Sequence, residues 1–293
     1  MAKNYVLHDR YLLTNKIGKG GFGLIYEGVD LDSRIQVAIK IENIENTKYL
    51  KHEASIYKYM YLNLKAFKSL EPIFPQVFWY GSESSLNILV MELLGPNLNQ
   101  LMYHIKGFTL KTICMLAINM ITNLEILHSL GIIHCDLKPE NFLMGRGDKA
   151  NRVYLIDFGL SAHYLDENLK HKGISSGTSF QGTLLYASVN SHMGISLSRR
   201  DDLESLGYIL IYFLKRALPW TNKKEKKERW GEIKRNLSVQ DLTDGLPEAL
   251  ALFFKYIKQL EYEETPNYSY LRDLFLSLMN ENGFTLDLIY DWI

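Results

Sequence analysis

The pattern of apolar residues changes once along this 293-residue chain, near the Gly95-Pro96 pair. Before it lie short segments rich in β-branched and aromatic residues and broken by Gly and Asp, such as 11–18, 23–30, 36–42 and 86–98. Segments of this kind are typical of strands. After it, residues 110–130 carry apolar side chains at helical spacing, with Gly131 at the natural stop. The sequence predicts a small β-rich part joined to a larger helical part, an α+β fold.

One helix is expected inside the β-rich part, over residues 47–64. Its apolar side chains recur close to helical spacing, at Leu50, Ile56, Tyr57, Met60 and Leu64. In the second part, further helices are expected at about 201–216, 247–260 and 268–280. The charge run 222–229 is most simply a solvated helix face.

The bulk composition fits a domain with a substantial core. Hydrophobic residues make up 47% of the chain, which is ample for one large domain or two lobes that share a core. Lys plus Arg and Asp plus Glu both number 33, so no global field attracts nucleic acid or an anionic membrane. Cys114 and Cys135 form no CxxC or His/Cys cluster. Disulfide frameworks and structural zinc are therefore disfavoured.

The expected location is intracellular. The first residues lack the apolar core and cleavage site of a signal peptide, and residue 2 is Ala, which excludes N-myristoylation. No run of apolar residues approaches the roughly 18 that a membrane helix needs. We expect a cytoplasmic protein, with the nucleus as an additional location.

A glycine-rich turn lies between the first two expected strands. Gly18, Gly20 and Gly23 fit G-x-G-x-x-G, with Gly21 and Phe22 inside the turn. Such a loop brings main-chain N–H groups close to phosphate oxygens. A strand pattern follows Gly23, whereas a dinucleotide-binding fold would open a helix there. The pattern favours a flap over nucleotide phosphates, and a plain hairpin turn is the alternative.

Five polar residues follow this loop in an order that suits phosphoryl transfer. Lys40 ends VAIK on a strand, and Glu53 lies thirteen residues further on, in the expected helix, where it could pair with Lys40. Asp136 in HCDLKPEN would accept the proton of a substrate hydroxyl. Asn141 and Asp157 would supply the oxygen ligands that Mg²⁺ prefers. Each residue alone is weak evidence, but the full order is hard to obtain by chance.

These motifs resemble the casein kinase 1 group of protein serine/threonine kinases. The resemblance covers nearly the whole chain. It rests on MELLGPNL (91–98), HCDLKPENFLMG (134–145), IDFGL (156–160), YASVNSHMG (186–194), RRDDLESLGYILIYF (199–213) and the segment 268–292.

The resemblance implies a bilobal protein kinase fold over 1–293, with an N-lobe (1–91), a hinge (92–97) and a C-lobe (98–293). It implies that Mg·ATP donates its γ-phosphoryl group to Ser or Thr hydroxyls of acidic or already phosphorylated protein substrates. Lys138 would offset charge on the transferring group, Thr183 would hydrogen-bond near Asp136, and Asp202 would hold the catalytic loop. The nucleotide would contact the glycine-rich turn, Lys40 and Ile17, Ile25, Ala38, Met91, Glu92, Leu94, Leu143 and Ile156. We expect a monomer that binds neither nucleic acid nor membrane.

Cys135 stands where most kinases carry arginine in H-R-D. That arginine commonly binds a phosphate on the activation loop and orders it. Cys135 cannot do this, yet the arginine performs no chemistry, so Asp136 is not disabled. The sequence predicts an active kinase that does not need activation-loop phosphorylation. A small buried hydrophobe is an equally compatible role for Cys135.

Other departures concern substrate choice. Leu185 replaces the arginine of the motif usually read G-T-A-R-Y, and segment 161–181 lacks the usual basic pattern apart from Lys170, His171 and Lys172. We therefore expect weak selectivity for pre-phosphorylated substrates. A partial replacement is conceivable at Lys223, Lys224, Lys226 and Lys227, although solvation alone explains this run equally well.

Two alternatives stay open at this point. A pseudokinase scaffold would bind nucleotide or a partner without transfer, although such proteins commonly lose at least one of the residues that are intact here. A different nucleotide-binding enzyme is disfavoured by the strand after Gly23 and by the lack of a G-x-x-x-x-G-K-[ST] loop.

Overall fold

The computed structural model describes residues 5–20, 23–45, 49–64, 73–221 and 226–293. The chain divides into two compact units. We call the first the sheet unit, which comprises Met1–Gly95, Met144–Ala150 and Tyr154–Gly159. We call the second the helical unit, which comprises Pro96–Leu143, Asn151–Val153 and Leu160–Ile293.

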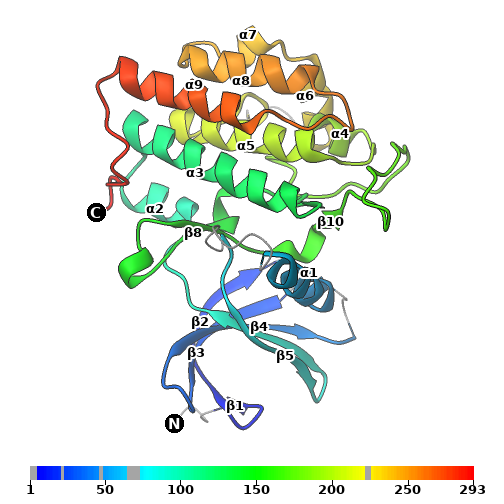
Figure 1. Ribbon diagram of the computed structural model, residues 1–293, viewed down its shortest axis with the longest axis vertical. Helices are drawn as coiled ribbons and strands as arrows, with labels where there is room; N and C mark the ends of the chain where they lie inside the picture. The colour runs from blue at the N-terminus through cyan, green and yellow to red at the C-terminus, as the bar shows by residue number, and fades with distance from the viewer. Residues whose placement is uncertain (1–4, 21–22, 46–48, 65–72, 222–225) are drawn as a thin grey trace. The chain divides into compact units, whose positions relative to one another are not determined.

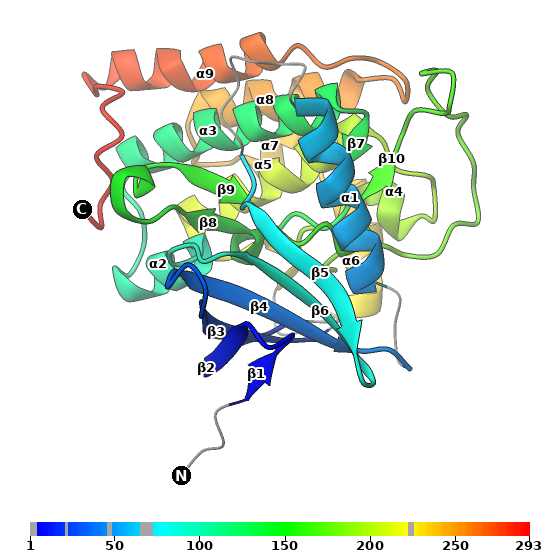
Figure 2. The same cartoon turned by 60° about the horizontal axis from the view of Figure 1, so that its bottom comes forward.

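An antiparallel sheet of six strands, in the order β1-β2-β3-β4-β6-β5, forms the sheet unit (Figure 2). The strands are β1 (Val6–Leu7), β2 (Tyr11–Gly20), β3 (Gly23–Asp30), β4 (Gln36–Asn43), β5 (Val77–Glu83) and β6 (Leu86–Glu92). Alternate residues of β4 and β6 point to one face, so Val37, Ile39, Ile88 and Val90 form its core with Leu7 and Tyr11. Strands β2, β3, β4 and β6 lie where the sequence predicts them.

Two strands of this sheet escaped the sequence prediction. β1 is only two residues long, which is too short for any period. β5 reads VFWYGSE, and most of its residues are half-buried rather than alternately buried and exposed. A strand without clean alternation carries no period-two signal.

Helix α1 (Tyr49–Leu64) packs against β6. The predicted stripe of Leu50, Ile56, Tyr57, Met60 and Leu64 is buried, which confirms the helical spacing. Glu53 is buried on the same helix at 1% exposure. A buried carboxylate is costly unless it is paired, so the position of Glu53 demands a partner.

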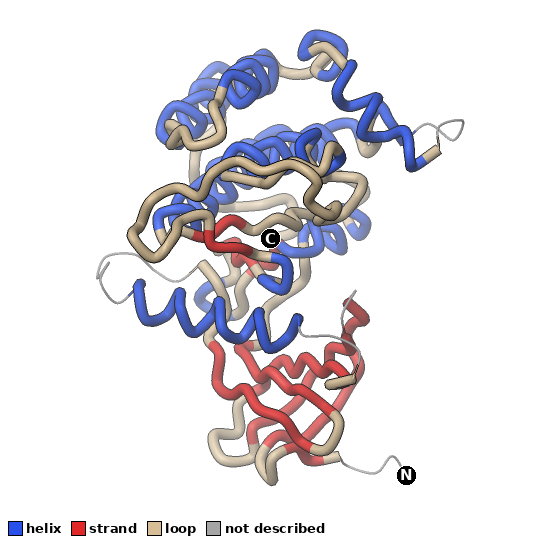
Figure 3. The backbone as a smooth tube through the Cα atoms, turned by 90° about the vertical axis from the view of Figure 1, so that its right-hand side faces the viewer, coloured by secondary structure: helices blue, strands red, loops and turns tan. Residues whose placement is uncertain are grey.

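Helices dominate the helical unit (Figures 1 and 3). They are α2 (Leu98–His104), α3 (Leu110–Ser129), α4 (Val189–His192), α5 (Arg199–Lys215), α6 (Trp230–Asn236), α7 (Val239–Leu242), α8 (Glu248–Gln259) and α9 (Tyr268–Glu281). α3 packs against α5 and α9, and α8 packs against the same two helices. The short strands β7 (Ile132–Ile133) and β10 (Ala162–His163) pair antiparallel. Strands β8 (Phe142–Met144) and β9 (Val153–Leu155) lie where the chain passes from one unit to the other. The expected architecture of a β-rich part followed by a larger helical part is confirmed.

Helix α3 is apolar on almost every side because it lies in the core of the helical unit. Within the described residues it is the one helix long and apolar enough to cross a membrane by length and composition, which the sequence analysis did not anticipate. In the structure 72% of that stretch is buried, which is the property of a core helix. Thr109 caps its first turn by accepting a hydrogen bond from the Thr112 N–H.

The three longer helices predicted in the C-terminal half are confirmed as α5, α8 and α9, whereas the shorter ones were missed. α4 and α7 have four residues each, and α2 and α6 have seven, so none of them shows more than two turns of a repeat. The charge run lies partly outside the described residues. Residues 226–229 are exposed, but they form a 3₁₀ turn (Lys227–Arg229) that leads into α6, and not an α-helical face.

The aromatic contact between α8 and α5 gives a stability prediction. Phe254 is fully buried, and its ring centroid lies 5.5 Å from that of Tyr208 and 5.9 Å from that of Phe253. Phe254→Ala should lower the free energy of unfolding by about 3–5 kcal/mol, because it leaves a cavity in the core. Urea denaturation measures this, with Tyr103→Ala as the control, since Tyr103 on α2 is 88% exposed. Equal losses in the two variants would contradict the assignment of Phe254 to the core.

Candidate active site

Strand register brings several of the predicted nucleotide-site residues onto one face of the sheet. Gly18 on β2 pairs with Ile25 on β3, and Ile25 pairs with Lys40 on β4. Ala38 lies two residues before Lys40 and pairs with Met91 on β6. Directly paired residues and residues two apart share a face. Gly18, Ile25, Ala38, Lys40 and Met91 therefore form one continuous surface.

Lys40 lies between two carboxylates. Its Nζ is 2.6 Å from Oε2 of Glu53 on α1 and 2.7 Å from Oδ1 of Asp157. Lys40 is 8% exposed and Glu53 is 1% exposed, so the partner that buried Glu53 requires is Lys40. We call Lys40, Glu53 and Asp157 the Lys40 cluster.

The electrostatics of the Lys40 cluster keep the lysine cationic. Burial alone would lower the pKa of Lys40, but the charges and hydrogen bonds of Glu53 and Asp157 outweigh it and hold the pKa above its ordinary value. Burial raises the pKa of Glu53, and the neighbouring Asp157 charge adds to this, while Lys40 opposes it. The result is a fixed positive charge on the sheet face, close to Gly18 and Ile25 in register.

Asp157 owes its position to an unusual backbone and an aromatic anchor. Its φ is +67°, in the left-handed region that few residues other than Gly adopt. The next residue, Phe158, is fully buried, and its ring meets Tyr57 of α1 edge-on at a centroid distance of 5.0 Å. Strained backbone of this kind concentrates at functional sites.

A second polar cluster lies in the helical unit, on the loop that follows β7. The carboxylate of Asp136 accepts hydrogen bonds from Lys138 Nζ at 2.6 Å and from Thr183 Oγ1 at 2.7 Å. The Asn141 side-chain N–H donates to the main-chain carbonyl of Asp136 at 2.9 Å. We call Asp136, Lys138, Asn141 and Thr183 the Asp136 cluster. All four were singled out from the sequence, and the structure brings them together.

The buried carboxylate of Asp202, on α5, holds the loop of the Asp136 cluster. It accepts from the main-chain N–H groups of His134 at 2.7 Å and Cys135 at 3.0 Å. His128 Nε2 lies 2.9 Å from the same carboxylate, which can only accept, so Nε2 carries the proton and Nδ1 accepts from Tyr268 Oη at 2.6 Å. Cys135 has φ +66°, so the Asp202 contacts fix a strained turn just before Asp136.

A comparison with known families identifies the family to which this chain belongs. Residues 11–281 match the sequence model of the protein kinase domain. This chain is a member of the protein kinase domain family. It is therefore a phosphotransferase that acts on proteins, built as the β-rich and helical parts of the two-lobed kinase fold. The reading as an unrelated nucleotide-binding enzyme is excluded.

The kinase domain has a neutral thiol at position 135. Burial raises the pKa of Cys135 well above its ordinary value, and the charges of Asp202, Asp201 and Asp136 raise it further. The side chain packs with Ile133 and Tyr164. Cys135 thus acts as a small buried side chain and not as a reactive thiolate.

Kinase domains generally use ATP and Mg²⁺, and the residues present suit both. A Cβ on Gly23 would come within 2.3 Å of the Ile41 carbonyl oxygen, so packing explains that glycine. A Cβ on Gly18 would meet only the Ile25 side chain, at an ordinary 3.6 Å, so packing does not require a glycine there. Open backbone at Gly18 suits the approach of a phosphate group.

The possible metal ligands are one carboxylate, on Asp157, and one amide oxygen, on Asn141. Within the described residues, no group of three His, Cys, Asp or Glu side chains could hold a metal by itself. Mg²⁺ usually takes one or two protein ligands and completes its shell with phosphate and water oxygens. Asp157 lies in the sheet unit and Asn141 in the helical unit, and each oxygen by itself suits Mg²⁺ that arrives with a nucleotide better than a resident metal.

The remaining predicted residues have the following positions. In the sheet unit Ile17 is 48% exposed, whereas Met91 and Leu94 are buried. Gly20 ends β2, Glu92 ends β6, and Ile156 follows β9. Leu143, on β8, belongs to the helical unit. Gly21 and Phe22 lie outside the described residues.

Sequence reasoning missed two residues that touch the backbone beside Thr183. Lys234 on α6 donates to the carbonyl oxygens of Leu184 at 2.9 Å and Ala187 at 2.7 Å, and Trp220 Nε1 donates to the Leu185 carbonyl at 3.0 Å. Lys234 lies in a seven-residue helix that contains other charged residues, so the sequence alone indicates an exposed side chain. Only the burial of Gly231 and Lys234 on one side of α6 distinguishes it.

Asp202→Asn tests the anchoring of the loop. The amide has one acceptor oxygen in place of a carboxylate, and its NH₂ would face a main-chain donor. Hydrogen bonds to a charged group contribute about 1.5–3 kcal/mol, so we expect a loss of that size in the free energy of unfolding. Thermal and urea denaturation measure it against Asp273→Asn on exposed α9 surface. An Asp202→Asn protein as stable as the control would show that the loop does not depend on this carboxylate.

Proposed function

We propose that this kinase domain is a serine/threonine kinase of the casein kinase 1 type, which transfers the γ-phosphoryl group of Mg·ATP to Ser or Thr hydroxyls of acidic proteins. The observation that carries the proposal is the Asp136 carboxylate, held by both Lys138 and Thr183. Together with the resemblance of the motifs, a hydroxyl-bearing Thr183 beside the catalytic carboxylate favours Ser/Thr over Tyr as the acceptor.

Each cluster has a role in this proposal. Asp136 would accept a hydrogen bond from the substrate hydroxyl, orient its oxygen, and take its proton as the new P–O bond forms. Lys138 would offset negative charge on the transferring group, and Lys40 would bind phosphate oxygens of the nucleotide. Asn141 and Asp157 would hold Mg²⁺. Bound Mg²⁺ neutralises charge on the phosphates and leaves the protein mainly the task of positioning.

We assign the adenine to the apolar residues of the predicted set. Ile25, Ala38 and Met91 share the sheet face with Lys40, which supports their assignment. Ile17, Leu143 and Ile156 are proposed from the resemblance. Hinge contacts are proposed for Glu92 and Leu94. The Glu92 main-chain N–H already donates to the Gln76 carbonyl at 2.7 Å, so a contact from Glu92 would use its own carbonyl oxygen.

Independence from activation-loop phosphorylation is supported by the hydrogen bonds within segment 161–196. The N–H of Thr178 donates to the Gly194 carbonyl at 3.0 Å, and the N–H of Ser196 donates to the Ser175 carbonyl at 2.9 Å. Lys172 Nζ donates to the His163 carbonyl at 2.7 Å. Two main-chain hydrogen bonds and one from the Lys172 side chain thus support an ordered segment without the ion pair between a phosphate and an arginine that Cys135 cannot make.

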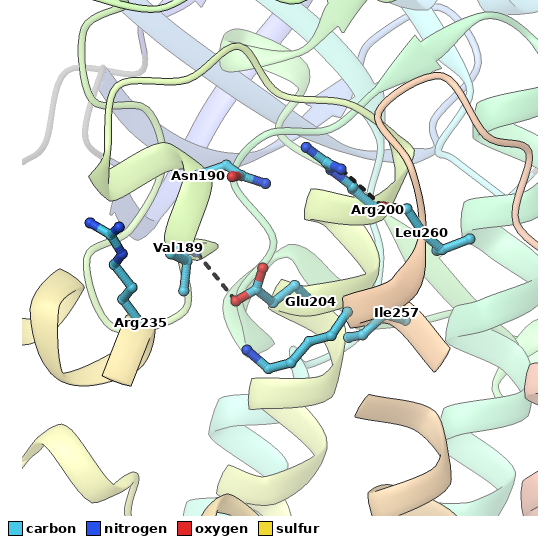
Figure 4. A pocket seen from close by; sticks show the side chains of 8 residues that line it. Val189, Asn190, Arg200, Glu204, Arg235, Ile257 and Leu260 are labelled. Atoms are coloured by element: carbon cyan, nitrogen blue, oxygen red, sulfur yellow. Dashed lines mark hydrogen bonds between the residues drawn. The ribbon is translucent and has the colours of Figure 1, made fainter. Parts of the chain in front are cut away.

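The proposed preference for acidic substrates is supported by a cationic pocket lined by residues of α4, α5, α6 and α8 (Figure 4). It has a volume of about 200 Å³, and its charged lining residues are Arg200, Arg235, Lys258 and Glu204. Three cations against one carboxylate attract an acidic peptide. Glu204 is engaged, since it accepts from the Val189 N–H at 3.3 Å and from Tyr208 Oη at 2.5 Å. Of the four lysines predicted as a partial replacement, Lys223 and Lys224 lie outside the described residues, and Lys226 and Lys227 are exposed.

We further propose that the enzyme acts as a monomer in the cytoplasm, with access to the nucleus, and that its lobes are residues 1–91 and 98–293 with the hinge at 92–97. These proposals come from the sequence and the resemblance.

Phosphate transfer from Mg·ATP to casein is the test of the proposed activity. Asp136→Asn should lower kcat by about 10²–10⁴-fold, because a positioned base contributes that much, while ATP still stabilises the protein in an Mg²⁺-dependent thermal-shift assay. Phosphoamino-acid analysis of the product should show Ser and Thr. No transfer by the wild-type chain, with ATP still bound, would favour the pseudokinase scaffold, and Cys135→Arg would then be the first variant to make.

Substrate selection is tested with one peptide in acidic, neutral and pre-phosphorylated versions. Leu185 offers no cation to a phosphate, so we expect the acidic and pre-phosphorylated peptides to have about equal kcat/KM. Arg235→Glu should raise the KM of both anionic peptides and leave the neutral peptide unchanged. Lys255→Glu, an exposed lysine on α8, is the matched control. A large preference for the pre-phosphorylated peptide would contradict the reading of Leu185 as a lost anion site.

A further inference from the structure

Lys234 is the most deeply buried lysine among the described residues outside the Lys40 cluster, and the proposed function gives it no role. It is 2% exposed and lies on α6. Its Nζ has three polar partners, the carbonyl oxygens of Leu184 and Ala187 and Nε2 of His192 at 3.2 Å. Among the described residues no carboxylate lies within ion-pair distance of it. A buried ammonium with carbonyl partners is costly, so a purely structural site would gain from an apolar residue.

Aromatic faces complete the surroundings of the ammonium. Nζ lies 4.7 Å from the ring centroid of Trp220 and 5.1 Å from that of Tyr208. Both rings are buried, and they meet each other edge-on. A cation over desolvated aromatic faces is attracted by their quadrupoles. The rings and the carbonyls therefore offset part of the cost of burying the protonated form of Lys234, in place of a carboxylate.

The carbonyls that Lys234 binds belong to a short turn that begins at Thr183. The main-chain N–H groups of Tyr186 and Ala187 both donate to the Thr183 carbonyl at 2.9 Å. Lys234 binds the carbonyls of the second and fifth residues of this turn, and Trp220 binds that of the third. The first residue, Thr183, donates its hydroxyl to Asp136. The turn therefore links the ammonium to the catalytic carboxylate through one rigid segment.

Close packing fixes the distance between α6 and this turn. A Cβ on Gly231, three residues before Lys234, would come within 2.5 Å of the His192 Cβ on α4. Ser191 on α4 in turn bonds the segment just before the turn, since its hydroxyl donates to the Gln181 carbonyl at 2.5 Å. Lys234 thus approaches the turn from a helix that cannot easily shift.

We propose that Lys234 is a positioning residue of the kinase reaction, which sets the place of Thr183, and through it of Asp136, by binding the carbonyls of the 183–187 turn. The proposal rests on the proposed function, because it takes Asp136 as the group that receives the substrate hydroxyl.

The proposed role of Lys234 should be visible in the pH dependence of kcat, because the charge of Lys234 changes near neutral pH. Burial lowers the pKa of Lys234 to about 7, and the Glu204 carboxylate on α5 opposes this shift. Of the other titratable groups that face it, burial and the Lys234 charge lower the pKa of His192 to about 4, and burial raises that of Tyr208 well above its ordinary value. Both stay neutral near pH 7, so Lys234 is the group that changes charge there.

If Lys234 positions the turn, kcat and the free energy of unfolding should change in opposite directions as the pH rises. The unfolded chain binds the Lys234 proton more tightly than the folded one, so above about pH 7 deprotonation of Lys234 raises the free energy of unfolding. The hold on the two carbonyls weakens over the same range, because a neutral amine is a poorer donor than an ammonium. Positioning therefore predicts that kcat falls as the protein becomes more stable.

The test compares wild type with Lys234→Met, which keeps the length of the side chain and removes its charge and donors. We expect kcat for a Ser-containing acidic peptide to fall about 10–100-fold, as misplaced catalytic groups do, with the KM for ATP unchanged. The decline of kcat above pH 7 in the wild type should be absent from the variant. Lys255→Met on exposed α8 surface is the matched control.

Hydrogen exchange gives a readout that does not depend on activity. The Tyr186 and Ala187 amides should exchange faster in Lys234→Met, while amides of α3 stay protected. Trp220→Phe removes the hydrogen bond to the Leu185 carbonyl and leaves a smaller ring beside Lys234, so the Tyr186 and Ala187 amides should again exchange faster, by a smaller factor. This variant is used if Lys234→Met does not fold.

Two outcomes overturn separate claims. Unchanged kcat, pH profile and exchange of the turn in a folded Lys234→Met protein would refute the positioning role alone. Absence of phosphate transfer by wild type would refute the proposed function, and exchange at 186–187 would still report whether Lys234 holds the turn.

Discussion

The hydrogen bonds of the buried Asp202 carboxylate position the loop that carries Asp136, and the proposed chemistry of the helical unit depends on them. The carboxylate accepts two main-chain N–H groups from a loop whose Cys135 adopts a left-handed backbone, and it lies 2.9 Å from His128 Nε2. Burial would raise the pKa of Asp202, but the hydrogen bonds from the His128 side chain and the His134 main-chain N–H outweigh it and keep the pKa below its ordinary value. Because the carboxylate stays ionised, its hydrogen bonds offset the strain of the turn and fix the direction in which the chain continues to Asp136.

In the sheet unit the side chain of Lys40 is held in a fixed position, on the face that the proposed nucleotide would contact. Two carboxylates hold Lys40, one from α1 and one that follows β9. Glu53 is wholly buried and serves only Lys40 and the neighbouring backbone, whereas Asp157 is more exposed. In the proposed function this asymmetry suits different roles: Glu53 would orient the lysine, and Asp157, which is more accessible, would meet a metal ion.

The sequence predicted what is periodic or has a fixed order, and it missed what depends on packing. The strands β2 to β4, the helix α3 and the paired residues of the Lys40 and Asp136 clusters follow from spacing and motif order. β5 was missed because its residues are half-buried on both faces, and α6 because it is only seven residues long and its charged residues suggest an exposed segment. Lys234 could not be recognised, since its role comes from Trp220, Tyr208 and the carbonyls beside Thr183, which are brought to it only by the fold.

Cys135 and Lys234 together suggest how this kinase domain orders its activation segment. An arginine at position 135 could bind a phosphate on that segment, which would make order depend on a modification. Here the cation comes from α6, is covalently part of the same unit, and binds carbonyls that are always present. A contact with a phosphate depends on modification of the chain, whereas the contact of protonated Lys234 with main-chain carbonyls requires no modification. This difference supports our proposal that the segment is ordered around Asp136 without phosphorylation.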